Sequence, residues 1–376
     1  MEQKTSFVRA LRQSGVLMAT AAMLTACTPP EPVRLGFVGG ISGRVADLGI
    51  GGRNGAQLAV EMRNAKGGIH GRPIKLLVED DQQNPEMAQV AVTRLIHVKA
   101  DAIVGPMTSA MAMATVPLVN QAQILMVSPT VTTPMLAGQD DYFFRVIAPT
   151  TEYAQKSAAY HFTTQGSRRV AAIYDMRNQS YTKTWLQDYR AAFEAAGGVF
   201  SDTVPFNSGE DTRFSALTER LLHSQPDGVL IVANSVDTAL MAQQIRKRDA
   251  KINIYTSEWA ATERLLELGG KAIEGMVIAQ FIDRASQQPA YLAFHKSYVE
   301  RFQQEPGYAG LTGFDAANVV LDALTARSDG QTLKQAVLAQ QSFSGAQSSI
   351  LFDANGDARR DTFMTTIRDG VFVRLR

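Results

Sequence analysis

The chain has 376 residues, of which 45% are hydrophobic and 19% are charged, with 37 basic and 36 acidic residues. Because this length exceeds what one ordinary core can hold, we expect two domains. The nearly neutral charge excludes the strongly basic surface of a nucleic-acid-binding protein, so no nucleic acid partner is expected.

The first residues have the composition of a signal peptide. A basic start precedes an uncharged, mostly apolar stretch at 15–26. That stretch is too short to span a bilayer, which needs about 20 residues. It ends in LTAC, which resembles a bacterial lipobox, so Cys27 is the expected lipidation site. We predict a lipoprotein signal peptide at 1–26, a lipidated Cys and tether at 27–32, and export to the cell envelope with a lipid anchor in the membrane.

From residue 33 the chain alternates short apolar runs with helical periodicity. The runs are bounded by Gly, Pro or Asp, as is typical of buried parallel strands. They lie at 33–39, 74–80, 101–105 and 124–128, and again at 170–175, 228–234, 252–257 and 275–280. Helical patterns separate them, and later ones lie at 288–304, 313–327 and 331–340, followed by β-like runs at 349–353, 363–368 and 371–375. The pattern predicts an α/β protein with two doubly wound, mostly parallel sheets.

Polar residues follow several of these strands, where open α/β sheets bind ligands. The run VGPMTS places Thr108 and Ser109 just where a helix would begin. Hydroxyls at a helix start either cap it or, with its N–H groups, hold an anion. A second hydroxyl cluster lies in SPTVTTP at 128–134. Glu258 follows a strand of the second unit, where it is either a charge at a helix N-terminus or the partner of a ligand ammonium group.

Several motifs, in this order, carry a family resemblance. They are VRLGFVGGISGRVADLG, NAKGGIHGRPIKLLVEDDQQNP, VGPMTS, VSPTVTTP, IYDMRNQSY and GFDAANVVLDAL. The chain resembles, over 33–376, the extracytoplasmic solute-binding proteins of ABC importers, in the branched-chain amino-acid-binding (type I periplasmic-binding) family. The resemblance implies two lobes joined by a three-crossing hinge, with 33–149 and 282–345 in the first lobe and 150–281 and 346–376 in the second.

The resemblance also implies the roles of individual residues. Ser109 and Thr132 match the hydroxyls that bind an α-carboxylate. The Thr130 carbonyl and Glu258 match the partners of the ammonium group, and Tyr181 matches the aromatic residue that closes over the ligand. A zwitterion fits this set, because a neutral solute would leave Glu258 without a countercharge.

The predicted side-chain pocket departs from the family pattern. Leu48, Asn234 and Phe314 are included in the ligand-binding set, but Leu48 and Asn234 stand where aromatic residues are common, and Phe314 replaces a frequent Tyr. The pocket is therefore not assigned to leucine, isoleucine or valine. Arg44 and Asp47 lie close by in the sequence and could make it polar, although we expect them at solvent-exposed lobe edges.

Other functional classes find little support. The run LGIGGRNG nearly matches a dinucleotide fingerprint, but it lacks the third glycine and a strand leading into it. The five histidines have no metal-ligand spacing, and no nucleophile–base motif occurs, so we predict no enzyme, metal or cofactor. We predict a monomer that captures an amino acid or related small zwitterion for an ABC permease of the inner membrane. The alternative is a ligand-sensing protein of the same fold that acts on a signalling partner.

Overall fold

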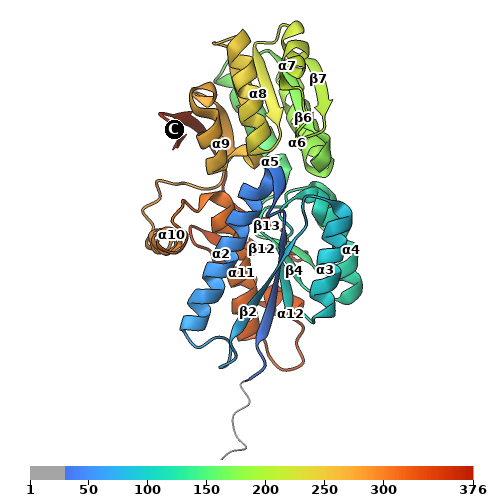
Figure 1. Ribbon diagram of the computed structural model, residues 1–376, viewed down its shortest axis with the longest axis vertical. Coiled ribbons are helices and arrows are strands. Elements are labelled where there is room, and N and C mark those ends of the chain that lie inside the picture. The colour runs from blue at the N-terminus through green and yellow to red at the C-terminus, as the bar shows by residue number, and fades with distance from the viewer. Residues whose placement is uncertain (1–29, 376) are drawn as a thin grey trace, which may run out of the picture.

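The computed structural model describes residues 30–375, so the predicted signal peptide at 1–26 and Cys27 lie outside the described residues. The described chain forms two lobes stacked along the long axis of the molecule (Figure 1). We call the lobe that begins at Val33 the first lobe and the other the second lobe. Between residues 30 and 375, no helix is both long and apolar enough to cross a membrane.

The first lobe is built on a five-stranded parallel sheet with the order β2-β1-β3-β4-β5. The strands are β1 (Val33–Gly39), β2 (Ile74–Asp80), β3 (Ala102–Val104), β4 (Met126–Ser128) and β5 (Phe143–Arg145). One face packs against α3 (Pro85–His97) and α4 (Ser109–Ala122), and the other against α2 (Ala46–Ala65) and α11 (Gly307–Ala326). Alternate residues of β1 enter the two cores, with Phe37 on the α2 side and Val38 on the α3 side, as strand pleating requires.

The second lobe holds a seven-stranded sheet with the order β15-β14-β10-β9-β8-β6-β7. Its strands are β6 (Arg169–Asp175), β7 (Val199–Phe206), β8 (Gly228–Val232), β9 (Asn253–Thr256), β10 (Val277–Gln280), β14 (Phe363–Arg368) and β15 (Val371–Arg374). Helices α5 (Thr150–Thr163) and α6 (Gln179–Ala195) cover one face, whereas α7 (Phe214–His223), α8 (Ser235–Arg248) and α9 (Glu263–Gly269) cover the other. β14 and β15 are antiparallel, so the sheet is mixed only at this edge, as the predicted fold class allows.

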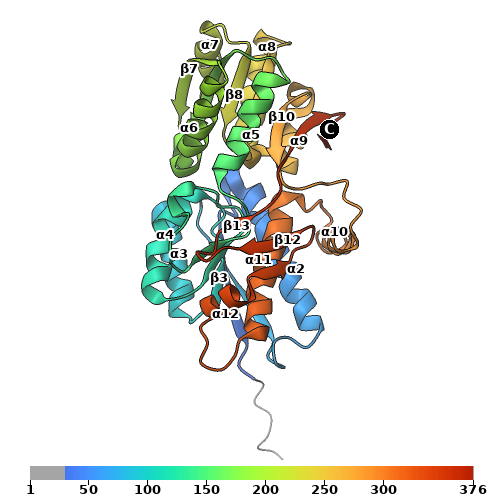
Figure 2. The same ribbon diagram turned by 180° about the vertical axis from the view of Figure 1, so that it is seen from behind.

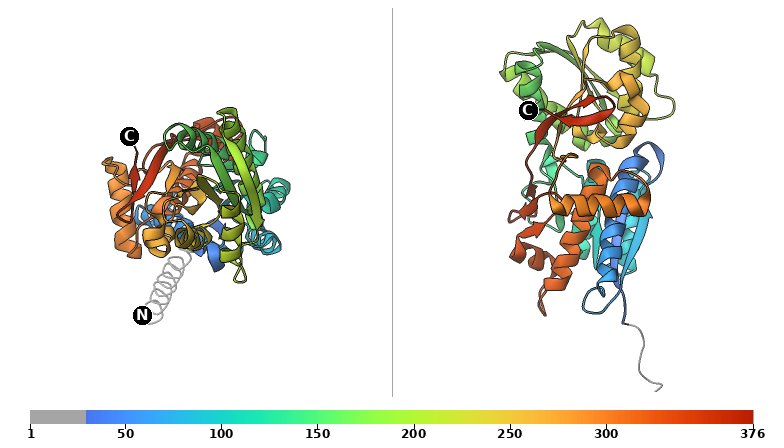
Figure 3. Two further views of the ribbon diagram at one scale, coloured as in Figure 1. Left: turned by 90° about the horizontal axis from the view of Figure 1, so that it is seen from above. Right: turned by 90° about the vertical axis from the view of Figure 1, so that its left-hand side faces the viewer.

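The chain crosses between the lobes three times: after β5, after β10 and after a small third sheet. This antiparallel sheet joins β11 (Ser342–Ser344), β12 (Ser349–Phe352) and β13 (Ala358–Arg359). An isolated bridge ties Arg145 to Asp357, so the segment stays with the first lobe. The predicted start of the second lobe at 346 is therefore corrected to about 360–362, and the chain then rises to the C-terminal hairpin of the second lobe (Figure 2; Figure 3, right).

Helices α10 (Pro289–Phe302), α11 and α12 (Leu333–Gln340) complete the first lobe after the second crossing. Glycines let α11 pack closely on α2, because a Cβ atom on Gly55 would clash with the carbonyl oxygen of Gly310 and one on Gly313 with that of Gly52. The glycines of LGIGGRNG thus lie inside α2, where Gly51 and Gly55 allow close packing on α11 and Gly49 allows the close approach of the Gly40 backbone.

Candidate functional site

A narrow cavity lies between the lobes, where the carboxyl ends of several strands meet. Its lining comes from both lobes and from the crossings: Leu48, Met107, Thr108, Ser109, Thr130, Thr132, Ile147, Asn178, Tyr181, Glu258, Trp259, Phe281 and Tyr308. This is the place that strand-end reasoning predicts for a ligand in an α/β fold.

The first lobe contributes a helix start and hydroxyls. Thr108 is the N-cap of α4, yet its side chain makes no capping bond and donates instead to Gln83 Oε1 at 3.1 Å. Ser109 Oγ accepts from the Thr133 N–H at 3.3 Å, which leaves its own proton free to donate. The Thr132 hydroxyl is buried and has no partner. These donors at the positive end of α4 form a site suited to a carboxylate.

The second lobe contributes one buried carboxyl group. Glu258 begins the short 3₁₀ helix η4 (Glu258–Ala260) and is 6% exposed. Its Oε1 accepts from the Tyr181 hydroxyl at 3.0 Å and its Oε2 from Trp185 Nε1 at 2.9 Å. Burial raises the pKa of Glu258 to about 7, and the two hydrogen bonds only partly offset that effect. A cationic group brought into the cavity would stabilise the ionised form.

Aromatic side chains form the remaining walls. The rings of Tyr181 and Trp259 meet edge to face with centroids 5.6 Å apart. Tyr308, at the start of α11, donates its hydroxyl to the Trp259 carbonyl at 3.2 Å and so links the two lobes beside the cavity. Phe281 follows β10 at the second crossing and packs edge to face on Tyr308.

Six of the eight residues of the predicted ligand-binding set line this cavity: Leu48, Ser109, Thr130, Thr132, Tyr181 and Glu258. Thr130 Oγ1 donates to the Met107 carbonyl at 2.5 Å, which fixes the loop after β4.

Asn234 and Phe314 do not line it. Asn234 caps α8 by accepting from the Asp237 N–H at 3.0 Å, which uses its side chain locally. Phe314 lies on α11 and packs on Phe294 with ring centroids 4.9 Å apart, because its helix face points into the first lobe. Both residues therefore lie outside the lining of this cavity, and Asn234 lines a neighbouring one.

Several lining residues were missed by sequence reasoning. Asn178 ends the 3₁₀ helix η3 (Met176–Asn178) of the second lobe, and its Oδ1 accepts from the Ala110 N–H of α4 at 3.0 Å. Ile147 lies on the first crossing and Phe281 on the second. Their proximity to the predicted lobe boundaries was the one available signal in the sequence.

Arg44 and Asp47 lie at the interface between the lobes, not on solvent-exposed edges as expected. Arg44 Nη1 lies 2.8 Å from an Asp237 carboxylate oxygen in the second lobe. Asp47 Oδ2 accepts from the hydroxyls of Ser235 at 2.6 Å and Thr262 at 2.5 Å. Residues of the second lobe supply every one of these partners, so the contacts hold the lobes closed.

Comparisons with known proteins agree with this architecture. A Leu/Ile/Val-binding protein, BraC3, of Rhizobium johnstonii is 27% identical over 260 residues, which cover 68% of this chain and 69% of that protein. A leucine-binding protein, LivK, of Thermotoga maritima has a solved structure with a TM-score of 0.84 and 26% identity, covering 92% of this chain and 98% of that one.

A solute-binding protein of an ABC transporter from R. palustris, solved with benzoate, shares the fold alone. Its TM-score is 0.83 at 18% identity, and the match covers 92% of this chain and 95% of that one. The same two-lobed scaffold thus serves chemically different ligands. The model of a family described as periplasmic binding protein matches residues 32–371, nearly the whole described chain. The chain therefore belongs to the periplasmic binding protein family.

Proposed function

We propose that this protein captures an amino acid, or a related small zwitterion, between its lobes and delivers it to an ABC permease of the inner membrane. The single observation that carries the proposal is that one cavity holds both hydrogen-bond donors suited to an anion and a buried carboxyl group suited to a cation. The α4 N-terminus and the Ser109 and Thr132 hydroxyls offer donors, while the buried Glu258 carboxyl offers an acceptor.

The carboxylate and ammonium groups of an amino acid match these donors and this acceptor. Its carboxylate would accept from the Ser109 and Thr132 hydroxyls, and its ammonium would donate to Glu258. The ligand would then touch both lobes, so binding would favour the closed arrangement by a differential affinity that the open arrangement lacks. The names of the two relatives above, which bind leucine or leucine, isoleucine and valine, are consistent with an amino acid ligand.

Thermal unfolding with a ligand panel tests this proposal. The protein is unfolded and refolded to strip bound solute, then heated with single amino acids, aromatic acids and sugars. A ligand at 100 times its dissociation constant adds about 2.7 kcal/mol to the free energy of unfolding, enough for a clear melting shift. We expect shifts with one or a few amino acids and none with their deaminated acids.

The variant Glu258→Gln sharpens the test, because it keeps the size of the side chain and removes its charge. It should weaken amino acid binding by roughly 2–5 kcal/mol, the usual cost of removing one member of a buried charge pair. Glu267→Gln, on the exposed face of α9, is the matched control and should bind as the native protein does. Equal affinity of the Glu258→Gln variant and the native protein would exclude an ammonium group at this position.

We also propose that the mature chain begins at Cys27 and is held to a membrane by lipid on that residue. The LTAC sequence and the short apolar stretch before it support this. Expression of the full chain with radiolabelled fatty acid should label the native protein and leave Cys27→Ser unlabelled; label retained in that variant would exclude Cys27 as the anchor.

A further inference from the structure

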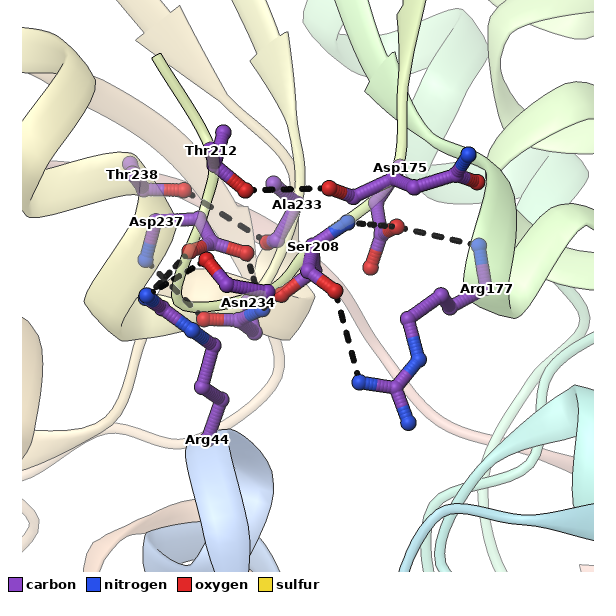
Figure 4. Close-up of polar contacts among 11 residues, drawn as sticks. Arg44, Asp175, Arg177, Ser208, Thr212, Ala233, Asn234, Asp237 and Thr238 are labelled. Carbon is purple, nitrogen blue, oxygen red and sulfur yellow. Dashed lines mark hydrogen bonds and ion pairs between the residues drawn. The ribbon is translucent and has the colours of Figure 1, made fainter. Parts of the chain in front are cut away.

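A second polar cavity lies between the lobes beside the first. Its lining includes Arg44 and Gln83 from the first lobe, and Asp175, Arg177, Asn234 and Trp259 from the second. Figure 4 shows Arg44 reaching up to the loop of Asn234 and Asp237, and Arg177 approaching Ser208 from the other side.

The two cavities adjoin each other at three points. Trp259 lines both of them. Thr108 lines the first and donates to Oε1 of Gln83, which lines the second, at 3.1 Å. Val45 of the second cavity and Leu48 of the first are one helical turn apart. A ligand whose charged head group lies against Ser109 and Glu258 could therefore extend its side chain past Trp259.

Two donors of this second cavity are buried and have no partner. They are Nε of Arg44 and Nε2 of Gln83, a residue only 8% exposed. The two terminal nitrogens of Arg44 donate to the Asp237 carboxylate and the Gly209 carbonyl, so Nε is the guanidinium nitrogen that remains without an acceptor. Buried unpaired donors are costly, and a carbonyl oxygen of a ligand would satisfy them.

The charges of the second cavity are balanced without a ligand. Arg44 is paired with Asp237, and Arg177 lies near Asp175, whose Oδ1 accepts from the N–H groups of Arg177 and Ser208 at 3.0 and 3.1 Å. A charged side-chain terminus would add an unpaired charge, whereas an aliphatic one would leave the two donors unsatisfied. A carboxamide offers a carbonyl oxygen to the donors and N–H groups to the Asp175 carboxylate.

We propose that this second cavity is a side-chain subsite that selects an amino acid ending in a carboxamide, recognised by Arg44 and Gln83. The inference rests on the proposed function, since the head group must lie in the first cavity.

Calorimetric titration with glutamine, glutamate and methionine tests the subsite, because the three side chains have similar lengths and differ at the tip. For the native protein we expect glutamine to bind at least about tenfold tighter than the other two, since buried polar groups that lose their partner discriminate strongly. Gln83→Glu keeps the acceptor for Thr108 and the size of the side chain but replaces the donor. It should weaken glutamine binding at least about tenfold and change methionine binding less than about threefold.

Two further variants act as checks. Arg44→Lys keeps a cation beside Asp237 but removes Nε, so it should also weaken glutamine more than methionine. Gln287→Glu, the same substitution on an exposed residue between the lobes' second crossing and α10, should change neither affinity.

Methionine binding tighter than glutamine in the native protein, or equal losses for both ligands in Gln83→Glu, would overturn the subsite. In either case, if the native protein binds amino acids and Glu258→Gln abolishes that binding, the proposed function stands and only the subsite is wrong. A native protein that binds none of the common amino acids would contradict both.

Discussion

Among single residues, Glu258 decides most about the first cavity. It is a carboxyl group buried among aromatic side chains, held by Tyr181 and Trp185. Because burial raises the pKa of Glu258 to about 7, a large fraction of its carboxyl groups are protonated at neutral pH in the ligand-free protein. The proposed ligand ammonium group would bind the ionised form, so ligand binding would lower the pKa of Glu258 and release a proton.

This linkage predicts how affinity depends on pH. Below pH 7 the ligand must displace a proton from Glu258, so the dissociation constant should rise as the pH falls, and should level off above pH 7. Between pH 8 and pH 5.5 we expect affinity to fall roughly 10- to 30-fold, since each pH unit below the pKa costs up to tenfold. Calorimetry in buffers of different ionisation enthalpy measures the released proton. A flat profile for the native protein, or the same slope in Glu258→Gln, would exclude Glu258 as the linked group.

Among the elements, the pair α2 and α11 holds the first lobe together. Helix α11 arrives after the second crossing, yet it packs on the helix that follows β1. The approach depends on backbone-to-backbone contact at Gly55 and Gly310, where a side chain has no room. This contact also orients the start of α11, from which Tyr308 reaches the cavity.

Substitution at this contact should therefore be destabilising. In Gly55→Ala the added methyl group meets backbone, which cannot move as a side chain could, so we expect a loss of about 2–4 kcal/mol in the free energy of unfolding, near the upper end for overpacking. Urea unfolding of the ligand-free protein measures it. Gly209→Ala, where a Cβ atom meets open space, is the control and should change stability by less than about 1 kcal/mol. Equal stability of the two variants would mean that the helices can separate without cost.

On the scale of the whole molecule, the lobes are held closed by polar contacts outside the first cavity. Asp47 accepts two hydroxyl hydrogen bonds from the second lobe, and Arg44 forms a partly buried ion pair with Asp237. These contacts exist only when the lobes meet, so they stabilise the closed state with or without a ligand. The fraction of ligand-free protein that is already closed determines how much closure of the lobes reduces the apparent affinity for the ligand.

Asp47→Ala should shift the ligand-free protein toward an open state. Small-angle X-ray scattering should show a larger radius of gyration without ligand and the native value with saturating ligand, while the dissociation constant rises by the factor by which the closed population falls. Two charge-assisted hydrogen bonds are lost, so a factor of roughly ten or more is expected. Glu300→Ala, which removes an exposed pair within α10, is the control. An unchanged radius and affinity in Asp47→Ala would show that the contacts do not control closure.

The sequence by itself determined the elements that have strong local signals. The strands β1 and β2 begin and end where the apolar runs predict, and helix α4 begins at the predicted hydroxyl residues after Gly-Pro. The residues of the first cavity could be found because strand ends of parallel sheets converge, which makes their position a property of the fold class. Two edge strands, β5 and β7, were missed: β7 is half-exposed and contains Pro205, so it lacks a continuous apolar run.

Only the tertiary structure decided which side chains meet across the lobes. Asp237 lies 193 residues from Arg44, and Thr262 lies 215 residues from Asp47, so no local pattern could pair them. Asn234 follows a strand as a ligand-binding residue would, but its side chain caps α8, and the direction of a side chain depends on the backbone around it. The third crossing lies after β13 because the pairing of β12 with its neighbours, a long-range property, keeps that segment on the first lobe.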